Sequence, residues 1–156
     1  MWYVISMMIL FVCTANIVRS YMAEAILKGK LKKMGKDDIE VGSAGLKDMH
    51  GAPADPVAQE ILEDNGYPLP GHHSRFLDQD QVSRADWIVV MEDRHRLSLL
   101  ETYPEAQEKI RLLKPFSREF DGVKMDIEDP YRQPTYRYRQ SFAEIYLALD
   151  GLIKCI

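Results

Sequence analysis

The 156-residue sequence predicts an α/β fold, a three-layer sandwich in which helices cover both faces of a four-stranded parallel sheet. Two observations predict it. Short, continuous apolar runs alternate along the chain with longer stretches whose apolar residues recur at helical spacing. The apolar runs carry few polar residues, as expected of parallel strands that are buried on both faces. We expect the strands at residues 7–12, 39–43, 87–91 and 110–113.

The helices are predicted from their apolar stripes and from the residues that begin and end them. A first helix follows Arg19, and its C-terminal end carries four lysines, whose charges suit the helix dipole. Asp55 caps a second helix, which has Pro56 in its first turn and stops at Asn65-Gly66. We expect the remaining helices to begin near residue 78, to span residues 93–102 and to include residues 142–153.

Composition and charge narrow the class of protein. The chain is 46% hydrophobic and 28% charged, which is typical of a globular protein with a sizeable core. Its net charge of −4 argues against nucleic acid as a partner. The two cysteines, Cys13 and Cys155, provide neither a disulfide framework nor a metal-ligand cluster. We therefore predict no metal and no cofactor.

The N-terminal segment is apolar, but no basic residue precedes it and no small-residue cleavage site follows it. It is also too short to span a bilayer, so we predict no membrane partner and a cytoplasmic setting, which suits the unpaired thiols. We predict one domain over residues 1–156, with residues 1–6 as a candidate extension before it.

The segment between the first strand and the first helix carries the chemistry. Cys13 and Arg19 are separated by five residues, and together they bracket a loop that enters a helix N-terminus. Such a loop points backbone N–H groups at one spot, which favours a bound oxyanion and a thiolate. The planar guanidinium of Arg19 suits two phosphate oxygens. Strand, cysteine loop, arginine and helix together predict phosphoryl transfer through a phosphocysteine.

Several motifs resemble those of the low-molecular-weight protein tyrosine phosphatases, in the family's order and over nearly the whole chain. The loop C-T-A-N-I-V-R-S-Y-M-A-E at residues 13–24 resembles the family signature. The other matching segments are Ser43-Ala44-Gly45, His72-His73-Ser74-Arg75, Val90-Met91-Glu92 and Asp129-Pro130-Tyr131.

The resemblance implies a role for each matching residue. Cys13 is the nucleophile, Arg19 holds the phosphoryl group, and Asp129 protonates the leaving oxygen, with Asp126 and Glu128 as fallback acids. The phosphate-binding loop comprises Thr14, Ala15, Asn16, Ile17, Val18 and Ser20. Hydrogen bonds that brace this loop are expected from Ser43 and His72, whereas the remaining histidines, His50, His73 and His95, are assigned to ordinary surface or core positions. The substrate rim comprises Met49, Tyr131 and Arg132.

The chain departs from the family pattern at several loop positions. Val18 stands where the family usually has a second cysteine, so Cys13 lacks a neighbouring thiol that protects it from overoxidation. Ala15 replaces a glycine, and Tyr21 replaces a proline at the helix start.

The sequence is compatible with four functions. A phosphatase of tyrosine-phosphorylated proteins, inhibited by phosphate or vanadate, is preferred, because the family's arginine-phosphate branch carries Thr where this chain has Ile17. The remaining three are a protein-arginine phosphatase, a thiol-dependent arsenate reductase, and a phosphate-binding module without turnover. An arsenate reductase needs two further relay cysteines, and only Cys155 remains.

Overall fold

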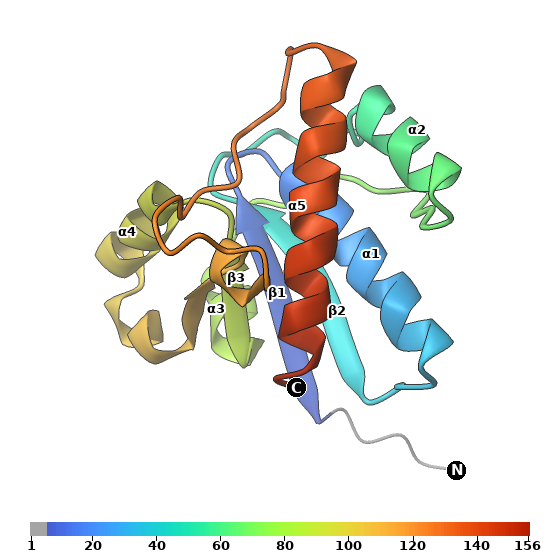
Figure 1. The fold of residues 1–156 in the computed structure, drawn as a ribbon. Coiled ribbons are helices and arrows are strands. Elements are labelled where there is room, and N and C mark those ends of the chain that lie inside the picture. Colours follow the sequence, from blue (N-terminus) through green and yellow to red (C-terminus); the bar gives the residue numbers. More distant parts are fainter. Residues whose placement is uncertain (1–5) are drawn as a thin grey trace.

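The computed structural model describes residues 6–156 and has a four-stranded, all-parallel sheet at its centre (Figure 1). The strands are β1 (Met7–Cys13), β2 (Ile39–Gly45), β3 (Trp87–Val90) and β4 (Ile110–Leu112), in the order β2-β1-β3-β4. The candidate extension at residues 1–6 lies outside the described residues except for Ser6, whose N–H donates to the Asp38 carbonyl.

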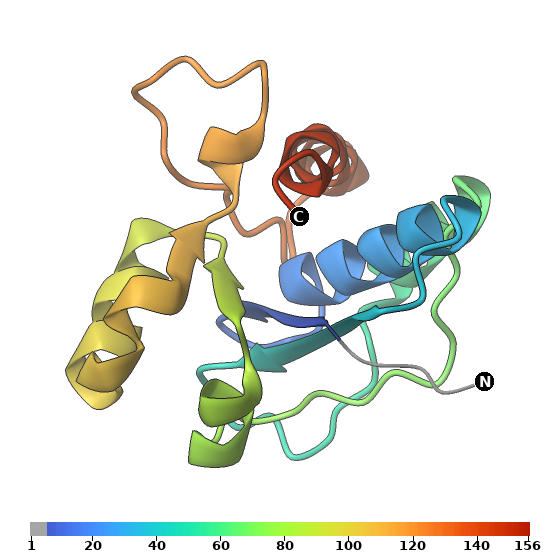
Figure 2. The ribbon, with the colours of Figure 1, turned by 90° about the horizontal axis from the view of Figure 1, so that it is seen from below.

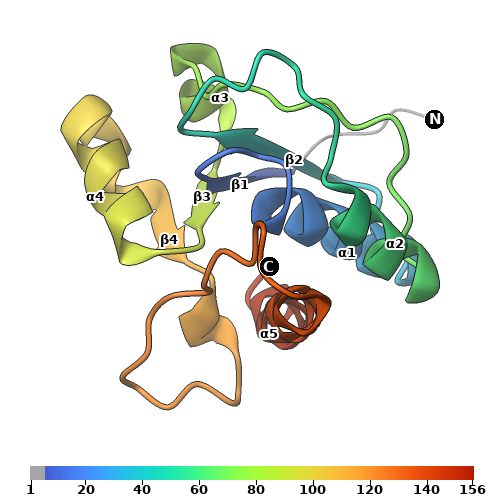
Figure 3. The ribbon, with the colours of Figure 1, turned by 90° about the horizontal axis from the view of Figure 1, so that it is seen from above.

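The helices divide between the two faces of the sheet (Figure 3). One face packs against α1 (Arg19–Lys33), α2 (Pro56–Asp64) and α5 (Thr135–Ile153), and the other against α3 (Gln79–Arg84) and α4 (Asp93–Thr102). Two short 3-10 helices, η1 (Pro104–Lys109) and η2 (Lys114–Phe116), flank β4. This three-layer arrangement confirms the predicted fold class.

Alternation along β1 explains why the sheet needs both helical layers. Ile9 and Phe11 face the core under α1 and α5, whereas Leu10 and Val12 face the core under α3 and α4. All four are at most 1% exposed, so the strand reads as one continuous apolar run, as expected of a central parallel strand.

The observed boundaries lie close to the predicted ones. β2 continues to Gly45, two residues beyond the expected end, because Ala44 and Gly45 still pair with Val12 and Cys13 of β1. The side chain of Asp55 caps α2, and that of Asp78 caps α3. The last helix begins at Thr135, directly after Pro134.

Candidate active site

The loop from β1 to α1 lies where the central strand ends and the helix on its face begins. Cys13 is the last residue of β1, and Arg19 is the first of α1. Both are buried, with 3% and 1% of their surface exposed. The unpaired N–H groups of a helix N-terminus point out of its first turn, so this end of α1 attracts an anion. The fold therefore brings the predicted thiol and guanidinium to one electropositive place.

Two donors approach the sulfur of Cys13. The Ser20 hydroxyl lies 3.0 Å from Sγ, and the Asn16 N–H lies 3.4 Å from it. Because Ser20 Oγ accepts a hydrogen bond from Asn16 Nδ2 at 2.8 Å, its own proton is free to be donated to the sulfur. Hydrogen bonds donated to sulfur favour the thiolate over the thiol.

Asn16 links the loop to the rest of the site. Its backbone φ of 60° lies in the left-handed region, which asparagine tolerates better than most residues. Its Nδ2 donates to Ser43 Oγ at 2.8 Å, and its Oδ1 accepts from the Arg75 N–H at 3.0 Å. The carbonyl of Asn16 accepts from His72 Nε2 at 2.7 Å. Ser43 and His72, the two predicted supporting residues, thus both contact this one asparagine.

The carboxyl end of β2 approaches the loop so closely that only glycine fits there. A Cβ atom on Gly45 would lie 3.0 Å from the carbonyl oxygen of Thr14 and from the carbonyl carbon of Ala15. Contacts this short would push the loop away from the sheet. The Ser-Ala-Gly segment therefore contributes two things to the site, the Ser43 hydroxyl and the space beside the loop.

Arg19 is held along one side of its guanidinium. NH1 donates to Glu92 Oε2 at 2.6 Å and to the Ile127 carbonyl at 2.8 Å, which occupies both of its protons. Nε and NH2 remain, and they form the planar edge that matches two oxygens of a phosphoryl group. NH2 lies 3.6 Å from Asp129 Oδ2.

Glu92, Arg94 and His95 form a network around Arg19 that the sequence did not predict. Arg94 NH2 donates to Glu92 Oε2 at 2.9 Å and to Thr14 Oγ1 at 3.0 Å. Burial would raise the pKa of Glu92, but the hydrogen bonds from Arg94 and Arg19 outweigh it and lower that pKa. Glu92 is therefore an ionised carboxylate that fixes the orientation of Arg19.

The geometry around His95 also defines its tautomer. Nδ1 accepts from the Glu92 N–H at 3.1 Å, so the proton is on Nε2 and is donated to Thr14 Oγ1 at 3.0 Å. Burial, followed by the charge of Arg19, lowers the pKa of His95 to about 4. The assignment of His95 to an ordinary position is therefore incomplete, because it is a neutral histidine that braces the loop at Thr14.

A positional signal for Glu92 was present in the sequence. It comes just after β3, which pairs with β1, and the carboxyl ends of neighbouring parallel strands meet at one edge of the sheet. His95 had no such signal, because a lone histidine on a helix has no pattern that distinguishes a loop contact from core packing.

A small cavity of about 30 Å³ opens beside Cys13. Its lining residues are Cys13, Ala15, Ile17, Val18, Arg19, Asp129 and Tyr131. The cavity therefore brings together the three predicted catalytic residues, part of the predicted loop and one predicted rim residue.

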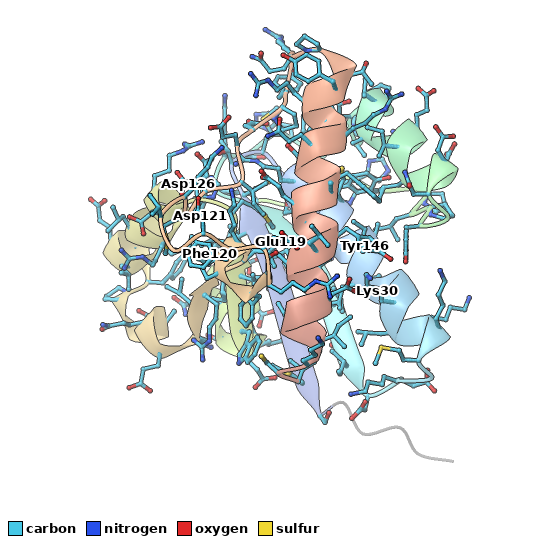
Figure 4. All side chains as sticks on the ribbon, viewed as in Figure 1. Lys30, Glu119, Phe120, Asp121, Asp126 and Tyr146 are labelled. Carbon is cyan, nitrogen blue, oxygen red and sulfur yellow. The ribbon has the colours of Figure 1, made fainter. Side chains whose placement is uncertain are left out.

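The two fallback acids have partners away from the cavity. Asp126 Oδ1 accepts from the Asp93 N–H at 2.8 Å at the start of α4, near which Asp126 lies in Figure 4. Glu128 is exposed and lies 3.5 Å from the ammonium of Lys124. Asp129 lines the cavity, whereas Asp126 and Glu128 do not.

Two predicted rim residues do not line the cavity. Met49 lies half-buried in the turn after β2, where its carbonyl accepts from the Ala52 N–H. The guanidinium of Arg132 lies 5.2 Å from the centre of the Tyr131 ring, outside the cavity. Of the expected rim, Tyr131 alone lines the cavity, and Met49 precedes a turn in which His50 and Gly51 both have positive φ.

The comparison with family models decides the relationship. Residues 8–156 match the model described as "Low molecular weight phosphotyrosine protein phosphatase". The chain belongs to this family. The predicted resemblance is therefore confirmed, and the low molecular weight phosphatases are phosphoric monoester hydrolases that act on phosphorylated proteins.

Relatives of this phosphatase include both tyrosine and arginine phosphatases. A low molecular weight protein-tyrosine-phosphatase of Streptomyces coelicolor is 33% identical, with 94% of this chain and 91% of the relative covered. A protein-arginine-phosphatase of Geobacillus stearothermophilus is 35% identical, with 92% of each chain covered. A crystal structure of the low molecular weight protein tyrosine phosphatase from T. tengcongensis superposes with a TM-score of 0.88 at 38% identity, covering 97% of this chain and all of that one.

Two further features lie away from the cavity. Cys155 is exposed near the C-terminus, at the end of the molecule opposite to the carboxyl end of β1 (Figure 1). Within residues 6–156, no helix is long and apolar enough to cross a membrane.

Proposed function

We propose that this phosphatase hydrolyses phosphotyrosine in proteins through a phosphocysteine intermediate. The observation that carries the proposal is the cavity in which the sulfur of Cys13, the free edge of Arg19 and the carboxylate of Asp129 converge. A thiolate, a bidentate cation and an acid are the groups that transfer of a phosphoryl group from a phenol requires.

In the first step, the thiolate of Cys13 attacks phosphorus, and the bond from phosphorus to the tyrosine oxygen breaks. Asp129 gives its proton to that oxygen, so a neutral phenol leaves. The Nε and NH2 edge of Arg19 and the loop N–H groups hold the phosphoryl oxygens, where negative charge concentrates.

In the second step, Asp129, now a carboxylate, takes a proton from a water molecule that attacks phosphorus. The bond between sulfur and phosphorus breaks, inorganic phosphate leaves, and the thiolate of Cys13 is restored. The Ser20 hydroxyl and the Asn16 N–H stabilise the sulfur as a leaving group, because both donate to it.

Preference for tyrosine rests on the apolar lining of the cavity. Ile17 lines the cavity and is 8% exposed, and Tyr131, from the segment before α5, lines it as well. An isoleucine and an aromatic ring pack well against the flat phenyl ring of phosphotyrosine. The guanidinium of phosphoarginine has N–H groups that would lose water here without gaining an acceptor from Ile17.

The decisive experiment compares two peptides that are identical except for phosphotyrosine or phosphoarginine. We expect a higher kcat/KM on phosphotyrosine, by at least about tenfold, which corresponds to roughly 1.4 kcal/mol. The variant Ile17→Thr introduces a hydroxyl and should shift the ratio of the two kcat/KM values toward phosphoarginine. Ile17→Val, which is also β-branched but has no hydroxyl, should leave this ratio unchanged. A wild-type preference for phosphoarginine would refute the proposed substrate.

An arsenate reductase and a binding module without turnover have less support. An arsenate reductase needs a relay of thiols at the nucleophile, and Cys155 lies at the far end of the molecule from Cys13 (Figure 1). A binding module without turnover has no need for a thiol nucleophile or for an acid beside Arg19.

A further inference from the structure

A second concave region lies at the end of the molecule opposite to the Cys13 cavity. It lies between the C-terminal halves of α1 and α5 and the short helix η2, and it encloses about 990 Å³. Figure 2 views this end, with α5 seen along its axis beside α1. Its first residue on α5 is Tyr146, roughly 16 Å along the helix from Thr135 at 1.5 Å per residue. We call this region the α1/α5 groove.

The lining of the α1/α5 groove is largely apolar and aromatic. Its apolar and aromatic members are Met34, Tyr67, Phe116, Tyr146, Leu147 and Ile153. Rings make up half of these side chains, so the groove offers flat surfaces on which another ring can lie.

Two glycines inside helices let the walls of the α1/α5 groove approach this closely. A Cβ atom on Gly29 in α1 would lie 2.5 Å from the Tyr67 ring. One on Gly151 in α5 would lie 1.8 Å from the carbonyl oxygen of Phe116. Glycine within a helix destabilises it by roughly 0.5–1 kcal/mol relative to alanine. The close packing of Tyr67 on α1 and of Phe116 on α5 therefore depends on glycines that lower the stability of the two helices.

The cations of the α1/α5 groove are only partly neutralised. The ammonium of Lys30 lies 3.6 Å from the centre of the Tyr146 ring and 2.5 Å from Asp150, the one acidic residue in the lining. Figure 4 shows Lys30 and Tyr146 side by side between the two helices. The ammonium of Lys33 lies 4.6 Å from the centre of the Tyr67 ring, a cation–π contact between two lining residues.

Three cations of the lining have no acidic partner. Among residues 6–156, no carboxylate lies within 4.0 Å of Lys33, Arg118 or Lys154. This local excess of positive charge occurs in a chain whose net charge is −4. An anion bound here would gain attraction from all three cations without first breaking an ion pair.

We propose that the α1/α5 groove binds a small aromatic anion. The ring of the ligand lies on the aromatic and aliphatic floor, and its carboxylate or phosphate meets Lys33, Arg118 and Lys154. This site is separate from the Cys13 cavity and does not depend on which phosphorylated residue the phosphatase hydrolyses.

Size and symmetry favour a small ligand over a second copy of the chain. A volume of about 990 Å³ lies near the upper end of the 300–1,000 Å³ range of small-molecule sites. A second copy, related by a twofold axis, would bring the same three cations against themselves, which like-charge repulsion opposes.

The test uses the full chain with a slight molar excess of vanadate, a tight-binding transition-state analogue, so that the Cys13 cavity is filled without a high oxyanion concentration that would also occupy the groove cations. The probe is 8-anilinonaphthalene-1-sulfonate, an aromatic anion whose fluorescence rises when it is bound. We expect saturable binding that the neutral N-phenyl-1-naphthylamine, which has the same ring body, matches only at about fivefold or more weaker affinity. Equal affinity for the two probes would mean that the groove is merely apolar and would overturn the proposal.

Charge variants distinguish specific binding in the groove from nonspecific binding of the probe elsewhere on the protein. The double variant Lys33→Gln with Arg118→Gln should weaken binding of the sulfonate by about tenfold, and Lys32→Gln by less than about twofold. Lys32 is an exposed lysine on the same turn of α1 and lies outside the groove, so it is the matched control. Equal losses in both variants, or no loss in the double variant, would overturn the assignment.

The position of the probe follows from amide chemical shifts in ¹H–¹⁵N spectra. The resonances of Gly151, which lines the groove, and of Gly29, which packs against the lining residue Tyr67, should shift on titration, while that of Gly45 beside the Cys13 loop should not. Shifts at Gly45 alone would place the probe in the Cys13 cavity. An acidic peptide that displaces the probe at lower concentration than 1-naphthoate does would replace the small ligand by a protein partner.

Discussion

Arg19 and Asp129 face each other at the Cys13 cavity, with NH2 of the guanidinium 3.6 Å from Oδ2 of the carboxylate. Arg19 is 1% exposed and fixed by Glu92, whereas the Asp129 side chain is 42% exposed and lies on the segment between η2 and α5. The fixed guanidinium of Arg19 is suited to holding a phosphoryl group, and the more exposed carboxyl group of Asp129 is suited to protonating the leaving oxygen beyond it. This arrangement leads to predictions for both residues.

Asp129→Asn should separate substrates by their leaving groups. Phosphotyrosine releases a phenol with a pKa of about 10, which needs a proton, so we expect kcat to fall by about 10²–10³-fold. p-Nitrophenyl phosphate releases a stabilised phenolate and should lose much less. Rates on the two esters, measured side by side with Glu128→Gln as the control, test this. Equal losses on both would assign Asp129 to positioning instead of proton transfer.

Arg19→Lys should lose most of the activity although it keeps the charge. Lysine has no planar edge to meet two oxygens, and its ammonium would not reach Glu92 and Ile127 as NH1 does. We expect kcat/KM on p-nitrophenyl phosphate to fall by at least about 10²-fold. Arg96→Lys, on the surface of α4, is the control. Comparable activity in Arg19→Lys would show that the planar edge of the guanidinium does not hold the phosphoryl group.

Cys13→Ser should abolish turnover and keep the binding of oxyanions. Binding depends on the loop N–H groups and Arg19, which the substitution leaves in place, whereas a serine hydroxyl is a far weaker nucleophile at neutral pH. Calorimetry with inorganic phosphate should give a dissociation constant within about threefold of the wild type. Near-normal turnover in the serine variant would exclude the phosphocysteine mechanism.

His95 should make the stability of the protein depend on pH. Its pKa is lowered from the ordinary 6.5 to about 4, so between these values the unfolded chain binds a proton that the folded protein does not. The free energy of unfolding therefore decreases as pH falls from 7 to 4, with a contribution from His95 on the order of 3 kcal/mol. Urea denaturation across this range measures it.

A variant isolates the contribution of His95 from those of the carboxylates. His95→Gln keeps a donor for Thr14 and does not titrate, so its stability should decrease less steeply between pH 7 and 4. His50 is exposed, and His50→Gln should follow the wild-type curve. If His95→Gln also followed that curve, protonation of His95 would not lower the free energy of unfolding, which would contradict the prediction.

Oxidation of Cys13 should not produce an internal disulfide. Val18 occupies the position of the thiol that neighbours the nucleophile in much of the family, and Cys155 lies at the other end of the sheet (Figure 1). We expect peroxide to inactivate the enzyme through sulfenic and higher acids of Cys13. Peptide mapping checks this, and a rapidly formed, reducible link between Cys13 and Cys155 would contradict it.

Local patterns were sufficient for the elements of the fold. Continuous apolar runs identified β1 and β3, because a central parallel strand has no polar face to interrupt it, whereas the edge strands β2 and β4 include the charged residues Glu40 and Arg111. Asp55 and Asp78 were predicted as helix starts, since a carboxylate can accept from the free N–H groups of a first turn, and both cap helices in the structure. The 3-10 helices beside β4 were not predicted, because single turns carry too few residues for a periodic pattern.

By itself, the sequence determined the family and the loop, because Cys13, Asn16 and Arg19 are neighbours along the chain and their spacing is a local property. Only the tertiary structure decided which distant groups surround them. Glu92 and His95 reach the loop from another strand and helix, and their roles depend on burial and hydrogen bonds, which no residue pattern encodes. The same holds for the α1/α5 groove, whose cations come from the end of α1, the turn after η2 and the end of α5 and gather only because α1 and α5 pack side by side.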